Sequence, residues 1–229
     1  MIQPGLLAAL AAALSLGIAG ARAQVAPTAA EKAGYRGLLA AAAQGNVAQI
    51  RAAARSEKFD TRDGYGRTAL HVAAYASHRD ALRALVSLGA DPNALENDRY
   101  DIVTIAAVAN DLATLEVALA LGGSARNVTS RYDGTALIAA AHLGHVEIVR
   151  TLIRAGAPLD HVNNLGWTAV IESIVLGDGG QRHQDTLKAL AEAGADLNLP
   201  DRNRRSPLAL AQARGYRAMI DYLRAMGAR

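Results

Sequence analysis

Apolar residues recur at helical spacing in short runs along most of the chain, and a glycine closes each run. The clearest copy is GTALIAAAHLGHVEIVRTLIRAGA, residues 134–157. Thr135 can cap an alanine-rich helix that ends at Gly144, because its hydroxyl accepts a hydrogen bond from the first free backbone N–H groups. Residues 146–153 place their apolar side chains on one face of a second helix, which Gly156 can close in the left-handed conformation. The stretch predicts two short helices, too small to bury their apolar faces alone.

The same pattern returns along the chain at a nearly constant interval. Its copies begin at Thr68, Asp101, Thr135, Thr168 and Ser206, at intervals of 33, 34, 33 and 38 residues. The run Thr-Ala-Leu-His, the paired alanines and the closing Gly-Ala-Asp at this period resemble the ankyrin repeat. The resemblance covers residues 34–229 and implies an all-α repeat solenoid of about six stacked repeats. Each repeat is then a helix pair with a β-hairpin finger.

The turn residues between the helix pairs divide the array. We expect repeats at approximately 34–58, 59–92, 93–126, 127–159, 160–197 and 198–229. The first lacks the threonine and the closing Gly-Ala-Asp, as terminal repeats often do because one of their faces meets water. The fifth carries surplus residues around 178–185, between its two helices. This insertion predicts a surface turn; a recognition loop beside the groove is the alternative.

The first residues of the chain have the features of a secretory signal peptide. Residues 6–19 are an uncharged leucine- and alanine-rich run, and Ala21-Arg22-Ala23 is a small-x-small cleavage site. We expect residues 1–23 to be removed between Ala23 and Gln24, which places the protein in the periplasm or outside the cell. An uncleaved anchor is the alternative, although the apolar run is shorter than the roughly 20 residues that span a bilayer. Residues 24–33 are expected to be a short polar linker.

The candidate chemistry is sparse. The chain has no cysteine, which excludes disulfides and thiol catalysis. His142 and His145 are three residues apart, but Gly144 separates them and no third ligand accompanies them, so a structural role is favoured over a metal site. The resemblance implies that His71 joins neighbouring repeats by hydrogen bonds. We expect neither an enzyme nor a cofactor.

The expected function is therefore binding. In ankyrin modules the partner usually meets the finger tips and the groove-facing end of the first helix of each repeat. Mapped onto this chain, these positions are Tyr65, Arg67, Tyr100, Arg131, Tyr132, Trp167, Arg202 and Arg205 on fingers and Tyr75, His142 and Arg214 at helix ends. Five of the nine aromatic residues fall on them, and exposed Tyr, Trp and Arg contribute most to binding energy at interfaces. A finger tyrosine that merely packs on its neighbour is the alternative for each position.

Charge is uneven along the chain, whose formal net charge is +3. Residues 201–229 hold seven arginines and two aspartates, a net charge of +5. A solvated C-terminal cap is the simplest interpretation, and a docking patch for an acidic protein or an anionic membrane is the alternative.

Together these features resemble the small signal-bearing ankyrin proteins of bacteria. We expect an exported, monomeric, non-enzymatic scaffold that binds a periplasmic protein through its concave face and does not bind nucleic acid. Two other functions remain open on the sequence. One is an inhibitor or immunity-type protein for an enzyme or toxin. The other is a membrane-associated stress-protection factor that docks through the basic C-terminal repeat.

Overall fold

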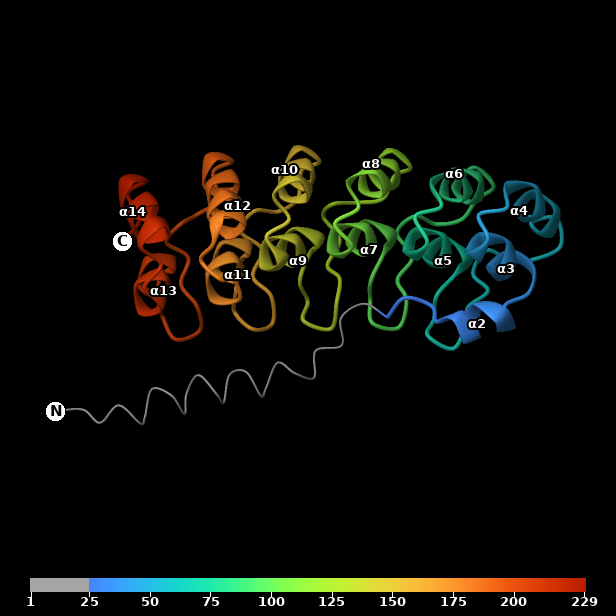
Figure 1. The fold of residues 1–229 in the computed structure, drawn as a ribbon, viewed down its shortest axis with the longest axis horizontal. Coiled ribbons are helices and arrows are strands. Elements are labelled where there is room, and N and C mark those ends of the chain that lie inside the picture. Colours follow the sequence, from blue (N-terminus) through green and yellow to red (C-terminus); the bar gives the residue numbers. More distant parts are fainter. Residues whose placement is uncertain (1–24) are drawn as a thin grey trace.

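The computed structural model describes residues 25–229, which form helix pairs stacked side by side in one array (Figure 1). A short helix, α2 (Ala29–Gly34), precedes the pairs. The pairs are α3 (Gly37–Ala43) with α4 (Val47–Ala53), α5 (Ala69–Tyr75) with α6 (Arg79–Ser87), α7 (Ile102–Val108) with α8 (Leu112–Ala120), α9 (Ala136–Leu143) with α10 (Val146–Arg154), α11 (Ala169–Val175) with α12 (Gln181–Glu192), and α13 (Pro207–Arg214) with α14 (Arg217–Ala225). The expected all-α repeat solenoid is confirmed, and one pair falls in each predicted repeat range.

The helices form two layers. The first helices of successive repeats contact one another, from α3 to α5 and onward to α13, and the second helices do the same from α4 to α14 (Figure 1). Each pair therefore packs mainly on its neighbours, as in other repeat arrays. None of the helices from residue 25 onward is long and apolar enough to cross a bilayer.

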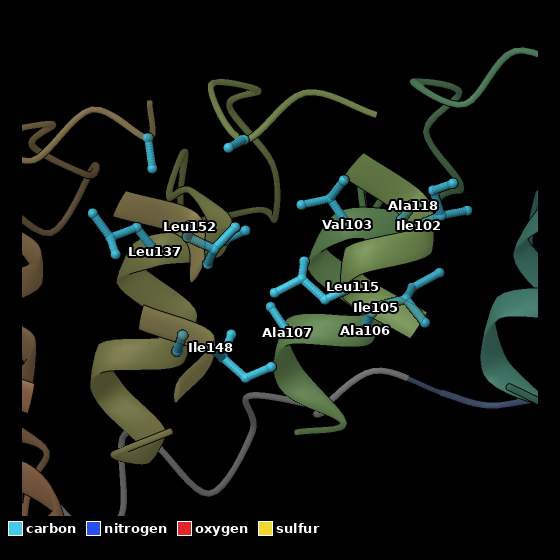
Figure 2. Packing of buried hydrophobic residues seen from close by; sticks show 14 of the residues in the cluster. Ile102, Val103, Ile105, Ala106, Ala107, Leu115, Ala118, Leu137, Ile148 and Leu152 are labelled. Carbon is cyan, nitrogen blue, oxygen red and sulfur yellow. The ribbon is translucent and has the colours of Figure 1, made fainter. Parts of the chain in front are cut away.

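Small side chains let the first helices approach closely. The paired alanines of α5, α7 and α9 are all buried, and Ala140 and Ala141 are 0% exposed. Larger aliphatic side chains of α7, α8, α9 and α10 fill the space around them (Figure 2). The buried residues of all repeats belong to one continuous hydrophobic cluster.

The expected caps are present. The Thr135 side chain accepts a hydrogen bond from the Ile138 N–H at 3.3 Å, and that of Asp101 accepts one from the Thr104 N–H at 2.7 Å. Gly156 has φ of 80°, the left-handed conformation that ends α10. Local side-chain chemistry therefore fixes where these helices begin and end.

The fingers between the pairs are tight turns. We number them by repeat, and each is closed by a backbone bond between its first and last residues: hairpin 2 (63–67), hairpin 3 (96–100), hairpin 4 (129–134), hairpin 5 (163–167) and hairpin 6 (201–205). Among the described residues, the isolated bridge between Thr129 and Gly134 is the sole β pairing. Hairpins this short cannot build the ladders of a regular strand, so the fingers are hairpins in connectivity only.

The insertion in the fifth repeat is mostly helical. Gly180 caps α12, which has 12 residues, whereas the second helix of the third or fourth repeat has 9. His183, inside the insertion, is buried; its Nδ1 lies 2.8 Å from Asp178 Oδ1 and its Nε2 lies 2.9 Å from the His142 carbonyl oxygen. The expected surface turn is thus limited to the residues before α12, and the insertion is attached to the fourth repeat rather than projecting as a loop.

The interpretation of residues 24–33 as a linker does not hold for the part that the structure describes. Pro27 is buried, and Thr28 forms a capping box with Glu31 at the start of α2. The Val25 carbonyl accepts a hydrogen bond from Arg67 at 2.8 Å. Residues 25–34 therefore pack on the second repeat. The expected signal segment and its cleavage site lie outside the described residues.

Candidate protein-binding surface

Hairpins 2 to 5 are linked edge to edge. Three backbone bonds join successive hairpins: Asn97 N–H to Tyr65 O at 3.1 Å, Ser130 N–H to Arg99 O at 3.1 Å, and Asn164 N–H to Tyr132 O at 2.8 Å. Hairpin 6 is joined differently, because it is the guanidinium of Arg202 that donates to the Asn164 carbonyl. The hairpins thus form one row along an edge of the array (Figure 1), which we call the hairpin row.

The aromatic side chains of the row occupy two kinds of position. Tyr65 and Tyr132 lie inside their turns, whereas Tyr100 and Trp167 are the residues that close theirs. Tyr100 and Trp167 pack against the hydrophobic core, while Tyr65 is 40% exposed and Tyr132 is half-buried. The four aromatics therefore differ in their setting. Tyr100 and Trp167 contact the core, whereas Tyr65 and Tyr132 belong to the turns.

Arg67 is a structural residue, and its assignment as a partner contact is wrong. Its side chain is 1% exposed. The guanidinium donates to Asp63 Oδ2 at 2.6 Å, to Glu31 Oε1 at 2.8 Å and to the Val25 carbonyl at 2.8 Å. Although burial opposes it, hydrogen bonds from Tyr35 and Arg67 hold the pKa of Asp63 below its ordinary value. The N-terminal segment covers this side chain.

The other arginines of the row differ in how far their charge is compensated. Arg131 pairs with Asp98, and Arg99 pairs with Asp133, each across two neighbouring hairpins. Arg205 pairs with Asp201 of its own hairpin at 2.7 Å. The candidate contacts Arg131 and Arg205 are therefore exposed but already ion-paired.

The helix-end positions present a mixed surface. Tyr75 is half-buried, and burial raises the pKa of its hydroxyl. The His142 side chain is 43% exposed. Arg214 is exposed at the end of α13, with its guanidinium 6.0 Å from the centre of the Tyr216 ring. All three are accessible.

The remaining histidines have structural partners. His71 Nδ1 lies 3.1 Å from the Thr68 backbone N, and its Nε2 lies 2.9 Å from the Ala94 carbonyl oxygen. Nδ1 therefore accepts and Nε2 donates, and this neutral ring joins the second and third repeats, as the resemblance to ankyrin repeats implied. His145 Nδ1 bonds to the Ala107 carbonyl at 3.0 Å. Over residues 25–229, no three His, Asp or Glu side chains gather as metal ligands do.

Comparison with known proteins agrees with this architecture. A family model for ankyrin repeats matches residues 10–96 and 103–201. The chain belongs to the ankyrin repeat family. The ankyrin repeat protein YahD of Escherichia coli (strain K12) is 32% identical over 192 residues, which are 83% of this chain and 95% of YahD.

Two solved ankyrin structures are similar along nearly their whole length. An ankyrin repeat domain from Acinetobacter baumannii AYE is 42% identical, with a TM-score of 0.78, and the match covers 84% of this chain and 98% of that domain. The ankyrin repeat protein EF0377 is 30% identical with a TM-score of 0.73, and the match covers 83% and 98% of the two chains.

One ankyrin position carries an unexpected buried acid. Glu172 is 4% exposed, at a position where the other repeats have an aliphatic residue. Its Oε1 accepts from Asn163 Nδ2 at 2.9 Å, and its Oε2, which has no hydrogen-bond donor, lies 3.6 Å from His142 Nδ1. Burial raises the pKa of Glu172 to about 7 and lowers that of His142. Aligning the copies, rather than searching for motifs, reveals this residue.

The sequence pattern also did not point to the apolar tip of hairpin 5. Val162 and Leu165 are 49% and 39% exposed, beside the half-buried Trp167. The segment from His161 to Trp167 contains no Asp, Glu, Lys or Arg, whereas each other hairpin contains charged residues. That absence of charge is the signal that could have located it.

Proposed function

We propose that this ankyrin array is an exported, non-enzymatic module that binds a protein partner on the hairpin row and on the groove-facing ends of the first helices. Ankyrin repeats generally mediate protein–protein interaction, and this chain shares the family's architecture along most of its length. The observation that carries the proposal is the hairpin row itself, an edge of linked hairpins on which Tyr65 and the arginines of hairpins 3, 4 and 6 are exposed and Tyr100, Tyr132 and Trp167 are half-buried.

Backbone bonding favours this edge as the contact surface. Hairpins 2 to 5 are held to one another by backbone bonds, so their tips are pre-organised and lose little conformational freedom on binding. Tyr132 lies in the turn of hairpin 4, near the middle of the row. Central aromatic side chains are the usual anchors of an interface.

Site-specific crosslinking tests the proposed surface. A photo-crosslinking amino acid at Tyr132, in protein expressed in its native host, should give a discrete adduct with one partner. The same group at Glu116, exposed on the second-layer helix α8, is the matched control and should not. Equal adducts at both positions would remove the hairpin row as the contact surface.

Substitution at the same position gives the affinity. Tyr132→Ala should weaken capture of the crosslinked partner at least about tenfold, roughly 1.4 kcal/mol, with the melting temperature nearly unchanged. Trp167→Ala should weaken capture and also lower the melting temperature, because the Trp167 side chain packs on the core. Unchanged capture by folded Tyr132→Ala protein would contradict the assignment.

Export is the second part of the proposal and rests on residues 1–23. The apolar run at residues 6–19 and the Ala21-Arg22-Ala23 site support cleavage before Gln24. Intact-mass measurement on protein from the native host should find a chain that starts at Gln24. Ala23→Phe, which places a bulky residue at the cleavage site, should leave it uncut. A membrane-retained native chain that starts at Met1 would refute cleavage.

A further inference from the structure

Hairpin 5 holds an apolar side chain at its tip. The Asn163 side-chain oxygen accepts hydrogen bonds from the backbone N–H groups of Leu165 at 3.0 Å and Trp167 at 2.9 Å. These bonds fix the turn, and Leu165 remains 39% exposed on it. Val162, which directly precedes the hairpin, is 49% exposed. A molecule that covers these two aliphatic side chains would gain the free energy of removing apolar surface from water.

Hairpin 6 places cations beside this tip. The stem of Arg202 lies against Gly166 so closely that a methyl group at Gly166 would collide with it. Its guanidinium donates to the Asn164 carbonyl. Arg204 is exposed in the left-handed conformation, with φ of 60°. No acidic side chain of the described residues pairs with Arg202 or Arg204, and Asp201 of the same hairpin pairs with Arg205.

The arginines of hairpins 2 to 4 are all paired with acids. In hairpins 3 and 4, Arg131 pairs with Asp98 and Arg99 pairs with Asp133. Within the hairpins, arginines without an acidic partner are thus confined to hairpin 6. Arg62, which directly precedes hairpin 2, is exposed at the far end of the row, and its guanidinium donates to the Gly66 and Leu95 carbonyl oxygens. A flat anionic membrane would present negative charge along the whole row, whereas a short acidic segment of a protein needs cations at one place only. This distribution favours a peptide over a bilayer.

We propose that hairpins 5 and 6 bind an extended segment of the partner protein that carries large apolar and acidic side chains together. The inference rests on the proposed function and names the chemistry of the partner. The apolar side chain of the segment covers Leu165 and Val162, and its carboxylates pair with the guanidinium groups of Arg202 and Arg204. Arginine suits this role because its planar fork can bind a carboxylate through two parallel hydrogen bonds.

Selection of peptides tests the proposal. A library of random short peptides displayed on phage is selected against the purified full chain. The enriched peptides should be net negative and should contain a leucine, isoleucine or aromatic residue. Binding of the strongest peptide should fall at least about tenfold, or 1.4 kcal/mol, in the double variant Arg202→Glu, Arg204→Glu and in Leu165→Ser, and should weaken as salt rises.

Matched controls separate local from general effects. The double variant Arg217→Glu, Arg224→Glu makes the same charge change at two exposed positions of α14, and Met226→Ser removes another exposed apolar side chain. Both should bind the peptide as the native chain does. Enrichment of neutral or basic peptides, no enrichment at all, or an equal loss in the controls would overturn the proposal.

Vesicle binding and crosslinking separate a peptide site from a membrane site and from a contact elsewhere on the row. Vesicles of phosphatidylserine and phosphatidylcholine should not compete with the selected peptide. If vesicles bind the native chain but not the Arg202→Glu, Arg204→Glu variant, and no peptides are enriched, hairpins 5 and 6 are a membrane-binding site instead. The double variant Arg202→Glu, Arg204→Glu and the variant Leu165→Ser are also crosslinked to the partner from Tyr132. If they still form the adduct and bind the partner with unchanged affinity, this inference is refuted and the proposed function stays intact.

Discussion

Glu172 shows how a single residue can make the array sensitive to pH. Burial raises its pKa from 4.5 to about 7, so the folded chain holds this proton more tightly than the unfolded chain does. The contribution of the protonated carboxyl to stability is therefore complete below pH 4.5 and is lost as the pH rises to about 7. The buried His71 acts in the opposite sense. The pKa of His71 falls from 6.5 to about 4, so its contribution is lost as the pH falls through that range.

Glu172→Gln isolates the acid, because glutamine keeps an oxygen for the Asn163 amide and cannot ionise. The free energy of unfolding of the variant, relative to the native chain, should rise on the order of 3 kcal/mol between acidic pH and slightly alkaline pH. Denaturant unfolding across that range measures it. Glu116→Gln, on the exposed face of α8, is the control for the chemical change. A difference that stays constant with pH would show that Glu172 does not titrate in this range.

Arg67 is the second residue whose environment sets its role. Arg67→Met keeps most of the aliphatic stem but leaves Asp63 and Glu31 without their cation, and losing one partner of a buried ion pair typically costs about 3–5 kcal/mol. Arg131→Met breaks the pair with Asp98. The Arg131 side chain is 58% exposed, and exposed pairs contribute only about 0–1 kcal/mol. Denaturant titration of both variants should separate these values clearly. Similar values for the two would mean that the N-terminal segment does not bury Arg67 in solution.

At the scale of single elements, local sequence is enough to predict most of what is observed. Thr135 and Gly156 act within one turn of the helices that they cap or close, so neighbouring residues alone reveal them. The insertion in the fifth repeat is the exception: its glycines suggest a turn, but most of it is helical. The residues that follow Gly180 are mostly good helix formers, and α12 accordingly begins at Gln181.

Close packing of the first helices gives an element-scale prediction. Ala140 is 0% exposed on α9, and Ala140→Leu should cost about 1–3 kcal/mol by overpacking the contact between repeats. Ala139→Leu, one residue earlier and half-buried, is the matched control and should cost clearly less. Thermal and denaturant unfolding of both variants measure the difference. If they unfold alike, the predicted register of the fourth repeat against its neighbours is wrong.

At the scale of the whole molecule, the period of the sequence is enough to predict the array but not the chemistry of its surface. The repeat pattern locates Tyr132 and Arg202 on hairpins. It does not show that Arg67 is covered, because the covering residues 25–34 precede the repeats and lack their pattern. It also does not show that Arg131 meets Asp98, since that pair joins two hairpins. Contacts between repeats require the stacked structure.

The way in which hairpin 6 is attached has a consequence for hydrogen exchange. The backbone N–H groups of Asn97, Ser130 and Asn164 are bonded to the preceding hairpin, but Arg202 reaches hairpin 5 with its side chain instead. The Arg202 amide should therefore exchange with solvent deuterium much faster than the other three, because no backbone acceptor protects it. The Asp201 amide, bonded to the Arg205 carbonyl at 3.0 Å, should stay protected and show that the hairpin itself is folded. Slow exchange at Arg202 would mean that hairpin 6 is held as firmly as the others. Fast exchange there would identify it as the one part of the row that can adjust its position when a partner arrives.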